Sequence, residues 1–199
     1  MSLRTRLFGS FDEPSWNLLG EAVAAYKVGK HAEAMSQFLW LSQQGSLISN
    51  VYIGRMYENG EGVEKNYHIA LEWYYKSAQV DLPTAQFYLA ELQRTLENYG
   101  DAIAWHKIAA EHGLVPSMFA LYRIYSLGQG VEIDEVEAEK YLREASDAGH
   151  VFAQKHRASR MARGRYGLLR IPYGVAFSMY SLVRGMIKLA QQKEPDLIY

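Results

Sequence analysis

Three kinds of feature in this sequence could in principle support catalysis: histidines, glycine-rich turns and pairs of acidic residues. The histidines are His31, His68, His106, His112, His150 and His156. None of them forms an H-E-x-x-H arrangement, so zinc hydrolysis has no support. The turns Gly60-Glu61-Gly62 and Gly128-Gln129-Gly130 lack the Lys-Ser/Thr of a phosphate loop. No serine stands in a G-x-S-x-G elbow, and nothing places an acidic pair such as Asp134 and Glu135 in a dry pocket. We therefore predict a protein that is not an enzyme and that has no metal and no cofactor.

Positive charge is concentrated in the last quarter of the chain. Residues 1–150 carry 12 Lys/Arg and 20 Asp/Glu, a net charge of −8, whereas residues 151–199 carry 9 and 2, a net charge of +7. The basic segment 155–170 also includes Tyr166, and such patches can bind phosphates. The pI near 6.6 and the acidic first part argue against nucleic acid as a partner. An acidic protein or an anionic lipid would use the same segment.

The rest of the chain is organised like the stretch from Ser49 to Asp81, which predicts a helix, a turn and a second helix. One apolar face of the first helix is formed by Ile53, Met56 and Tyr57. Gly60 is suited to end this helix in a left-handed conformation, and Asn66 is suited to cap the next one. In the second helix Ala70, Trp73 and Tyr74 recur at helical spacing. We expect Ala70 to face a close crossing beside Gly54, with Trp73 filling the space beyond it.

The same pattern recurs at a fixed register. The small residue of the second helix stands at Ala34, Ala70, Ala102 and Ala138, in steps of 36, 32 and 36 residues by subtraction. The first helix repeats as Ser49, Ala85, Ser117 and Ala153, with the same steps. The 32-residue step is four residues shorter than the others because one turn is shorter. The long turn is present at Gly60–Val63 and Gly128–Val131 and is missing before Asn98. A helix pair of this size needs neighbours to bury its apolar face, so the register predicts a stack of repeats.

This pattern resembles the Sel1-like repeat, a relative of the tetratricopeptide repeat. One copy comprises Ile53, Gly54, Tyr57, Gly60, Gly62, Val63, Asn66, Ala70, Trp73, Lys76, Ser77 and Ala78. A second comprises Leu121, Tyr125, Gly128, Gly130, Val131, Asp134, Ala138, Tyr141, Ala145 and Gly149. Tyr122 departs from the pattern, because Gly54 and Ala90 stand at its position in other repeats. The resemblance covers roughly Trp16 to Met161. It implies an all-α, right-handed superhelical solenoid of antiparallel helix pairs, with a concave face and a scaffold or adaptor role.

The register divides the chain into three parts. Residues 1–14 form an N-terminal arm, residues 15–164 form the repeat solenoid, and residues 165–199 form a basic connection and an apolar C-terminal helix. The repeats comprise residues 15–45, 46–81, 82–113, 114–149 and 150–164 onward, which gives about ten helices. We expect Trp16 and Trp40 in the core. No apolar run near Met1 is long enough for a signal peptide, so we expect a cytoplasmic protein.

The resemblance predicts a protein partner, which would be a peptide or a helix lying in the concave face. The polar side chains beside the core positions of the first helices are the candidates for this groove. They are Asn50, Arg55, Glu58, Gln86, Glu91, Arg94, Arg123 and Ser126.

The predicted C-terminal helix, residues 172–192, is apolar over an unusually wide part of its surface. Its run Ile171 to Val183 is too short to span a bilayer. Three roles stay open: packing against the fifth repeat, a homodimer or partner interface, and peripheral membrane contact beside the basic segment. The alternative function is therefore an assembly or membrane-surface anchor acting through residues 155–170 and 172–192. Its candidate residues are Arg160, Arg163, Arg165, Phe177, Tyr180, Leu182, Val183, Met186 and Ile187.

Overall fold

The computed structural model describes residues 13–162, 175 and 179–185. The chain forms two compact units, unit 1 from Met1 to Leu114 and unit 2 from Val115 to Tyr199. The described residues contain helices and no strand, so the prediction of an all-α protein is confirmed. Nine helices, α2 to α10, lie within residues 13–162, and residues 179–185 are helical as well.

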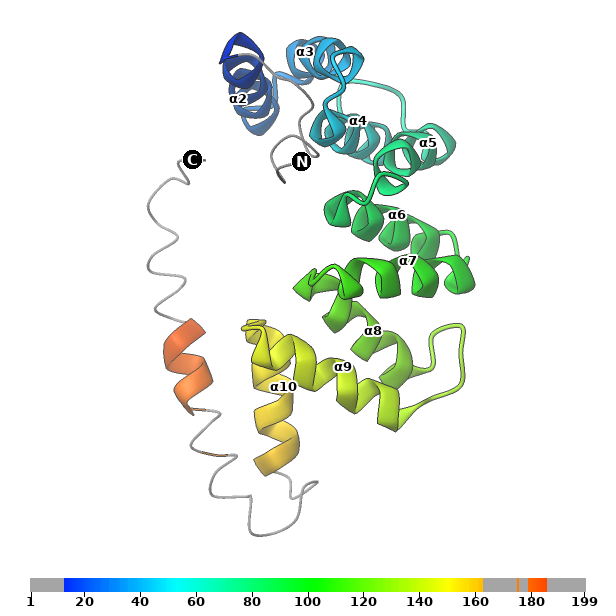
Figure 1. Cartoon of the computed structure of the whole chain (residues 1–199), viewed down its shortest axis with the longest axis vertical. Helices are drawn as coiled ribbons and strands as arrows, with labels where there is room; N and C mark the ends of the chain where they lie inside the picture. Colours follow the sequence, from blue (N-terminus) through cyan, green and yellow to red (C-terminus); the bar gives the residue numbers. More distant parts are fainter. Residues whose placement is uncertain (1–12, 163–174, 176–178, 186–199) are drawn as a thin grey trace. The chain divides into compact units, whose positions relative to one another are not determined.

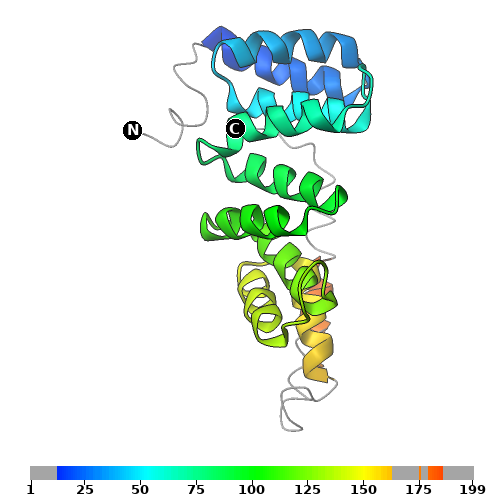
Figure 2. The ribbon, with the colours of Figure 1, turned by 90° about the vertical axis from the view of Figure 1, so that its right-hand side faces the viewer.

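Unit 1 holds three helix pairs in chain order. They are α2 (Glu13–Lys27) with α3 (His31–Gln43), α4 (Leu47–Asn59) with α5 (Tyr67–Ala78), and α6 (Pro83–Thr95) with α7 (Tyr99–Glu111). Each helix contacts the next one along the chain, and α4 also contacts α6 directly. The helices of unit 1 are therefore stacked in sequence order, as Figures 1 and 2 show. The first helices of the pairs, α2, α4 and α6, belong to successive repeats.

Unit 2 continues the pattern with α8 (Val115–Leu127), α9 (Glu135–Asp147) and α10 (Val151–Ala162). Helix α9 contacts both α8 and α10. In the helical segment 179–185, Ser181 and Gly185 are buried, and a Cβ at Gly185 would lie 3.4 Å from a methyl group of Val151. The small residues of this segment thus face unit 2, whereas Tyr180, Leu182 and Val183 are exposed.

Local signals placed the helix ends correctly. Gly60 ends α4 with φ 76°, and the Asn66 side chain accepts a hydrogen bond from the backbone N–H of Ile69 at the start of α5. Pro83 occupies the first turn of α6, where a missing N–H costs nothing. Asp134 caps α9 by accepting hydrogen bonds from two backbone N–H groups.

The sequence did not indicate which side chain packs over Gly54. A Cβ at Gly54 would lie only 2.5 Å from the Tyr74 ring, so Tyr74 fills the space over this glycine. Tyr74 is fully buried, while Trp73 packs at the edge of the core formed by the first two repeats. Adjacent helical residues point about 100° apart, and the helix turns its inner face toward Tyr74.

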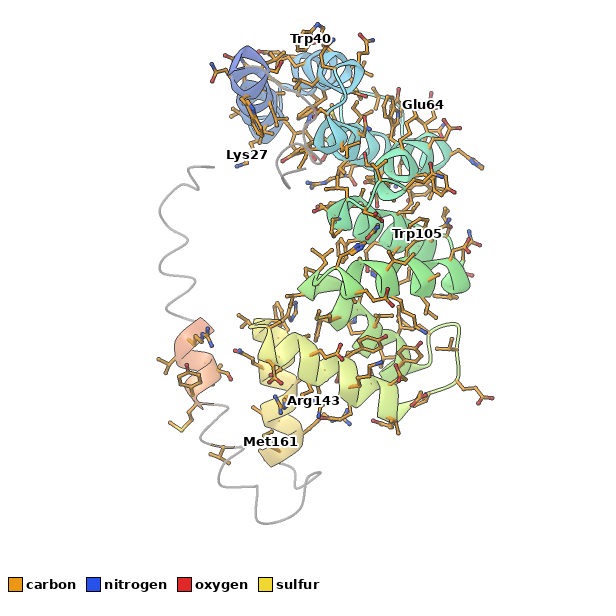
Figure 3. All side chains as sticks on the ribbon, in the orientation of Figure 1. Lys27, Trp40, Glu64, Trp105, Arg143 and Met161 are labelled. Carbon is orange, nitrogen blue, oxygen red and sulfur yellow. The ribbon has the colours of Figure 1, made fainter. Side chains whose placement is uncertain are left out.

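The two tryptophans expected in the core behave differently. Trp16 is partly buried and packs against the core of the first two repeats. Trp40 is 45% exposed and is labelled on α3 in Figure 3. The prediction for Trp40 was wrong because Phe38 and Leu41, both fully buried, supply the inner face of α3.

Candidate functional site

A small pocket lies between the first helices of repeats two and three, where α4 contacts α6. Its volume is about 130 Å³, well below the roughly 300–1,000 Å³ that holds a drug-sized ligand. Its walls are Ile48, Val51, Tyr52, Arg55, Thr84 and Tyr88. The lining residues are therefore mostly apolar or aromatic, with hydroxyls on Thr84 and the two tyrosines and one fixed charge, the Arg55 guanidinium. The size of the pocket corresponds to a single amino-acid side chain.

Aromatic rings hold the Arg55 guanidinium in place. The guanidinium carbon lies 5.6 Å from the centre of the Tyr26 ring and 5.3 Å from that of Tyr88, which is cation–π distance. Burial lowers the pKa of Arg55, but the surrounding tyrosines, Tyr88 first, raise it more, so the net shift is upward. Arg55 stays charged, and no carboxylate among the described residues pairs with it.

The tyrosine cluster (Tyr26, Tyr52, Tyr74 and Tyr88) is itself anchored by glutamates and rings. The Tyr26 hydroxyl donates to Glu61 and the Tyr74 hydroxyl donates to Glu58, both at 2.6 Å. The Tyr74 ring stacks on Tyr88 with 5.7 Å between centroids, and Tyr52 stacks on Phe38 at 4.7 Å. These contacts hold the four tyrosine rings in place within the protein itself.

The same contacts shift the pKa values of the tyrosines. Burial, followed by the hydrogen bond to Glu61, raises the pKa of Tyr26 to about 12. Burial also raises the pKa of Tyr74, and the hydrogen bond to Glu58 adds to the rise. Both hydroxyls therefore remain protonated donors, and both glutamates are engaged by them rather than by Arg55.

The other groove candidates of unit 1 make internal contacts. Asn50 is buried and bonds to Ser42 and Ser77, and Gln86 is buried and donates to the Ala78 carbonyl. Glu91 lies 2.8 Å from Arg94 and 3.2 Å from the buried His106. Burial alone would raise the pKa of Glu91, but the hydrogen bonds from His106 and Arg94 outweigh it and lower the pKa to about 2.

The candidates of unit 2 are more dispersed. Arg123 is exposed, and the Ser126 hydroxyl donates to its carbonyl. Arg160 lies 3.0 Å from Glu135 and 3.2 Å from Glu139, so the acidic α9 already neutralises it. Arg163, Arg165, Phe177, Met186 and Ile187 lie outside the described residues.

Sequence reasoning named Arg55 and Glu58 but missed three of the four tyrosines around them. Tyr52 and Tyr88 each precede a core position, Ile53 and Leu89, and are 36 residues apart by subtraction. That step is the repeat register, so the two rings could have been expected on neighbouring first helices. Tyr26 carried no comparable signal.

Two further properties of the described residues bear on other functions. No cluster of three or more His, Asp or Glu residues in that part of the chain could hold a metal ion. None of the helices described is both long enough and apolar enough to cross a membrane.

A comparison with protein families decides the class of this chain. The sequence model of the Sel1 repeat matches residues 48–81, 83–114 and 116–150. The chain belongs to the Sel1 repeat family. Sel1 repeat proteins generally act as protein-interaction scaffolds without catalysis, and they typically bind protein partners.

Solved structures confirm the Sel1 solenoid fold. A Sel1 repeat protein from Oxalobacter formigenes matches with a TM-score of 0.73 and 25% identity, covering 84% of this chain and 70% of that one. A protective antigen of uropathogenic Escherichia coli with an SLR fold matches at a TM-score of 0.59 and 25% identity, over 77% of this chain and 37% of its own. An immunity protein of Pseudomonas aeruginosa shares the fold at 19% identity, with a TM-score of 0.58, over 87% of this chain and 67% of its own.

Among curated proteins, this Sel1 repeat chain is similar to an exopolysaccharide production negative regulator of Rhizobium leguminosarum bv. viciae. The two are 24% identical over 144 residues, 63% of this chain. The chain spans 54% of the length of that relative.

Proposed function

We propose that this Sel1 repeat protein is a non-catalytic scaffold that binds a peptide or a partner helix on the first-helix face of unit 1, along α2, α4 and α6. The observation that supports the proposal most is the pocket between α4 and α6. A partner helix places a few anchor side chains in a groove, and the rings that line or adjoin this pocket are held in place by hydrogen bonds and stacking. Preorganisation lowers the entropy lost on binding.

The other groove candidates have different places in this proposal. Glu58 and Glu91 position neighbouring side chains, and Arg94 is paired with Glu91. Asn50 and Gln86 are buried, so they hold the helices in register. Arg123 and Ser126 lie on α8 of unit 2 and stand outside the proposed surface of unit 1.

A blocking substitution tests the proposal. Peptides selected from a random displayed pool against the full chain should lose binding when Thr84→Trp fills the pocket, because Thr84 is an exposed wall of it. The matched control is Ala104→Trp at an exposed position of the second helix α7. Binding measured by titration should survive in the control. Peptides that bind both variants equally would contradict a site on this face.

An alternative function is an assembly or membrane-surface anchor led by the C-terminal segment. The observation in its favour is that Met179, Tyr180, Leu182 and Val183 are all more than half exposed. Removing residues 172–199 should then abolish self-association or vesicle recovery while the rest stays folded. Loss of solubility instead would assign the segment to packing.

A further inference from the structure

In the Arg55 pocket of unit 1, the guanidinium charge has no counter-charge among the described residues. The two glutamates nearest in sequence, Glu58 and Glu61, accept hydrogen bonds from Tyr74 and Tyr26. No described carboxylate pairs with Arg55, whose contacts are the ring faces of Tyr26 and Tyr88. An arginine that a fold desolvates in part and leaves without an anion can accept one from a partner.

The geometry leaves the hydrogen-bonding edge of the guanidinium available. The guanidinium carbon lies over the Tyr26 and Tyr88 rings, and its N–H donors lie in the guanidinium plane. Among the described residues, no side chain accepts a hydrogen bond from these donors, so a partner can use them. A planar fork of donors matches a carboxylate, which can accept two parallel hydrogen bonds.

The pocket also limits the size of what enters. Its volume of about 130 Å³ is roughly four times the ~30 Å³ share of one liquid water, which fits one short side chain. Ile48 and Val51 form apolar walls for methylene groups. Removing water around the guanidinium would strengthen a charge pair formed there.

The net charge of unit 1 disfavours a ligand with two negative charges more than a ligand with one. Residues 1–114 carry 9 Lys/Arg and 13 Asp/Glu, a net charge of −4. A dianionic phosphate would face this acidic unit with only one fixed cation in the pocket. A carboxylate needs only that one cation.

We infer that the Arg55 pocket receives the carboxylate of an Asp or Glu side chain of a partner protein, and that Arg55 determines this specificity. The inference rests on the proposed function and names the chemistry of its ligand. The tyrosine cluster positions Arg55, and the apolar walls accommodate the aliphatic part of the acidic side chain.

The test uses two displayed pools of random 12-residue peptides, one with all residue types and one without Asp and Glu, each selected against the full chain. The complete pool should yield binders with an acidic residue at a fixed position. Arg55→Gln should weaken them about tenfold or more, which starts at the lower end of the effects measured for close interfacial charge pairs. Arg55→Lys should retain part of the affinity, because it keeps the charge and loses the fork. The control is Arg143→Gln, an exposed arginine on α9 (Figure 3).

A double-mutant cycle completes the test. Changing the acidic peptide residue to its amide should cost the same tenfold with Arg55 present and nothing in Arg55→Gln. Thermal melts of each variant separate a binding defect from unfolding.

The outcomes distinguish the inference from the proposed function. If the acid-free pool gives equally tight binders that Thr84→Trp blocks, the carboxylate specificity is overturned and the scaffold role stands. If no binder from either pool is blocked by Thr84→Trp, both are overturned. Peptides copying residues 1–14 and 188–199 are tested too. Arg55-dependent binding of either, or a dimer in light scattering that Arg55→Gln dissociates, would assign the pocket to this chain itself and overturn the inference.

Discussion

Repeats two and four, residues 46–81 and 114–149, both bury a tyrosine near the helix crossing, but they supply it from opposite helices. Repeat two has Gly54 on its first helix and Tyr74 on its second. Repeat four has Tyr122 and Leu142 at the corresponding positions, each 68 residues further along. All four are buried. The bulky ring therefore stands on the second helix in repeat two and on the first helix in repeat four, and the helix register is the same in both repeats.

Because the two tyrosines stand on different helices, the hydroxyls of Tyr74 and Tyr122 meet different partners. Tyr74 donates to Glu58 on α4 and stacks under Tyr88, so it supports the Arg55 pocket. The Tyr122 hydroxyl lies 3.2 Å from His156 on α10, so it ties α8 to the next repeat. Arg123 occupies the register position of Arg55 but is exposed. The Arg55 pocket of repeat two therefore depends on having the buried tyrosine on the second helix of the repeat.

The largest effect should follow from removing the ring of repeat two. Tyr74→Ala deletes a fully buried aromatic side chain and leaves Glu58 without its donor, so we expect a loss of about 3–5 kcal/mol in the free energy of unfolding. Urea unfolding of the full chain measures it. Leu142→Ala, the equivalent change in repeat four, should cost less. An equal or larger cost for Leu142→Ala would break the comparison.

The next largest effect on stability should come from Glu91 in repeat three. Glu91 occupies the repeat position at which repeats two and four have Arg55 and Arg123. The folded state lowers the Glu91 pKa from 4.5 to about 2. This contribution to stability is complete above the unfolded value and is lost as the pH falls from about 4.5 toward about 2. It corresponds to at most about 3 kcal/mol.

Unfolding by urea at pH 7 and pH 3 measures this contribution. Glu91→Gln should flatten that part of the pH profile, and Glu111→Gln, which removes an exposed carboxyl at the end of α7, should not. A profile unchanged by Glu91→Gln would show that the contacts of Glu91 with Arg94 and His106 do not link stability to pH.

A smaller loss of stability should follow from adding a methyl group at Gly54, opposite the Tyr74 ring. Gly54→Ala places a methyl group against the Tyr74 ring and should cost about 1–3 kcal/mol through overpacking. In the double variant Gly54→Ala/Tyr74→Leu, which approaches the pattern of repeat four, the two costs should not add. The control Gly20→Ala, where a Cβ meets no atom within 4 Å, should be neutral or stabilising. Additive costs at Gly54 and Tyr74 would show that the two positions are independent.

The sequence was sufficient for the helix pairs, since glycine, asparagine and proline act locally at Gly60, Asn66 and Pro83. It was insufficient for choosing the ring that packs over Gly54, which is Tyr74, because periodicity identifies a face and not the rotation of the helix. Of the site, Arg55 was predicted from register alone. Its environment was not, because Tyr26 and Tyr88 come from other repeats and reach it only through helix stacking.

The composition of the Arg55 site has a consequence for cooperativity. Tyr26, Arg55 and Tyr88 belong to three consecutive repeats, and solenoid repeats interact mainly with their nearest neighbours. Local opening of α2 would take Tyr26 away from the guanidinium without unfolding the rest of unit 1. A bound partner would oppose that opening and couple the terminal helix pair to the two that follow. Hydrogen exchange in α2 and α3 would then slow on binding, even at amides that the partner does not touch.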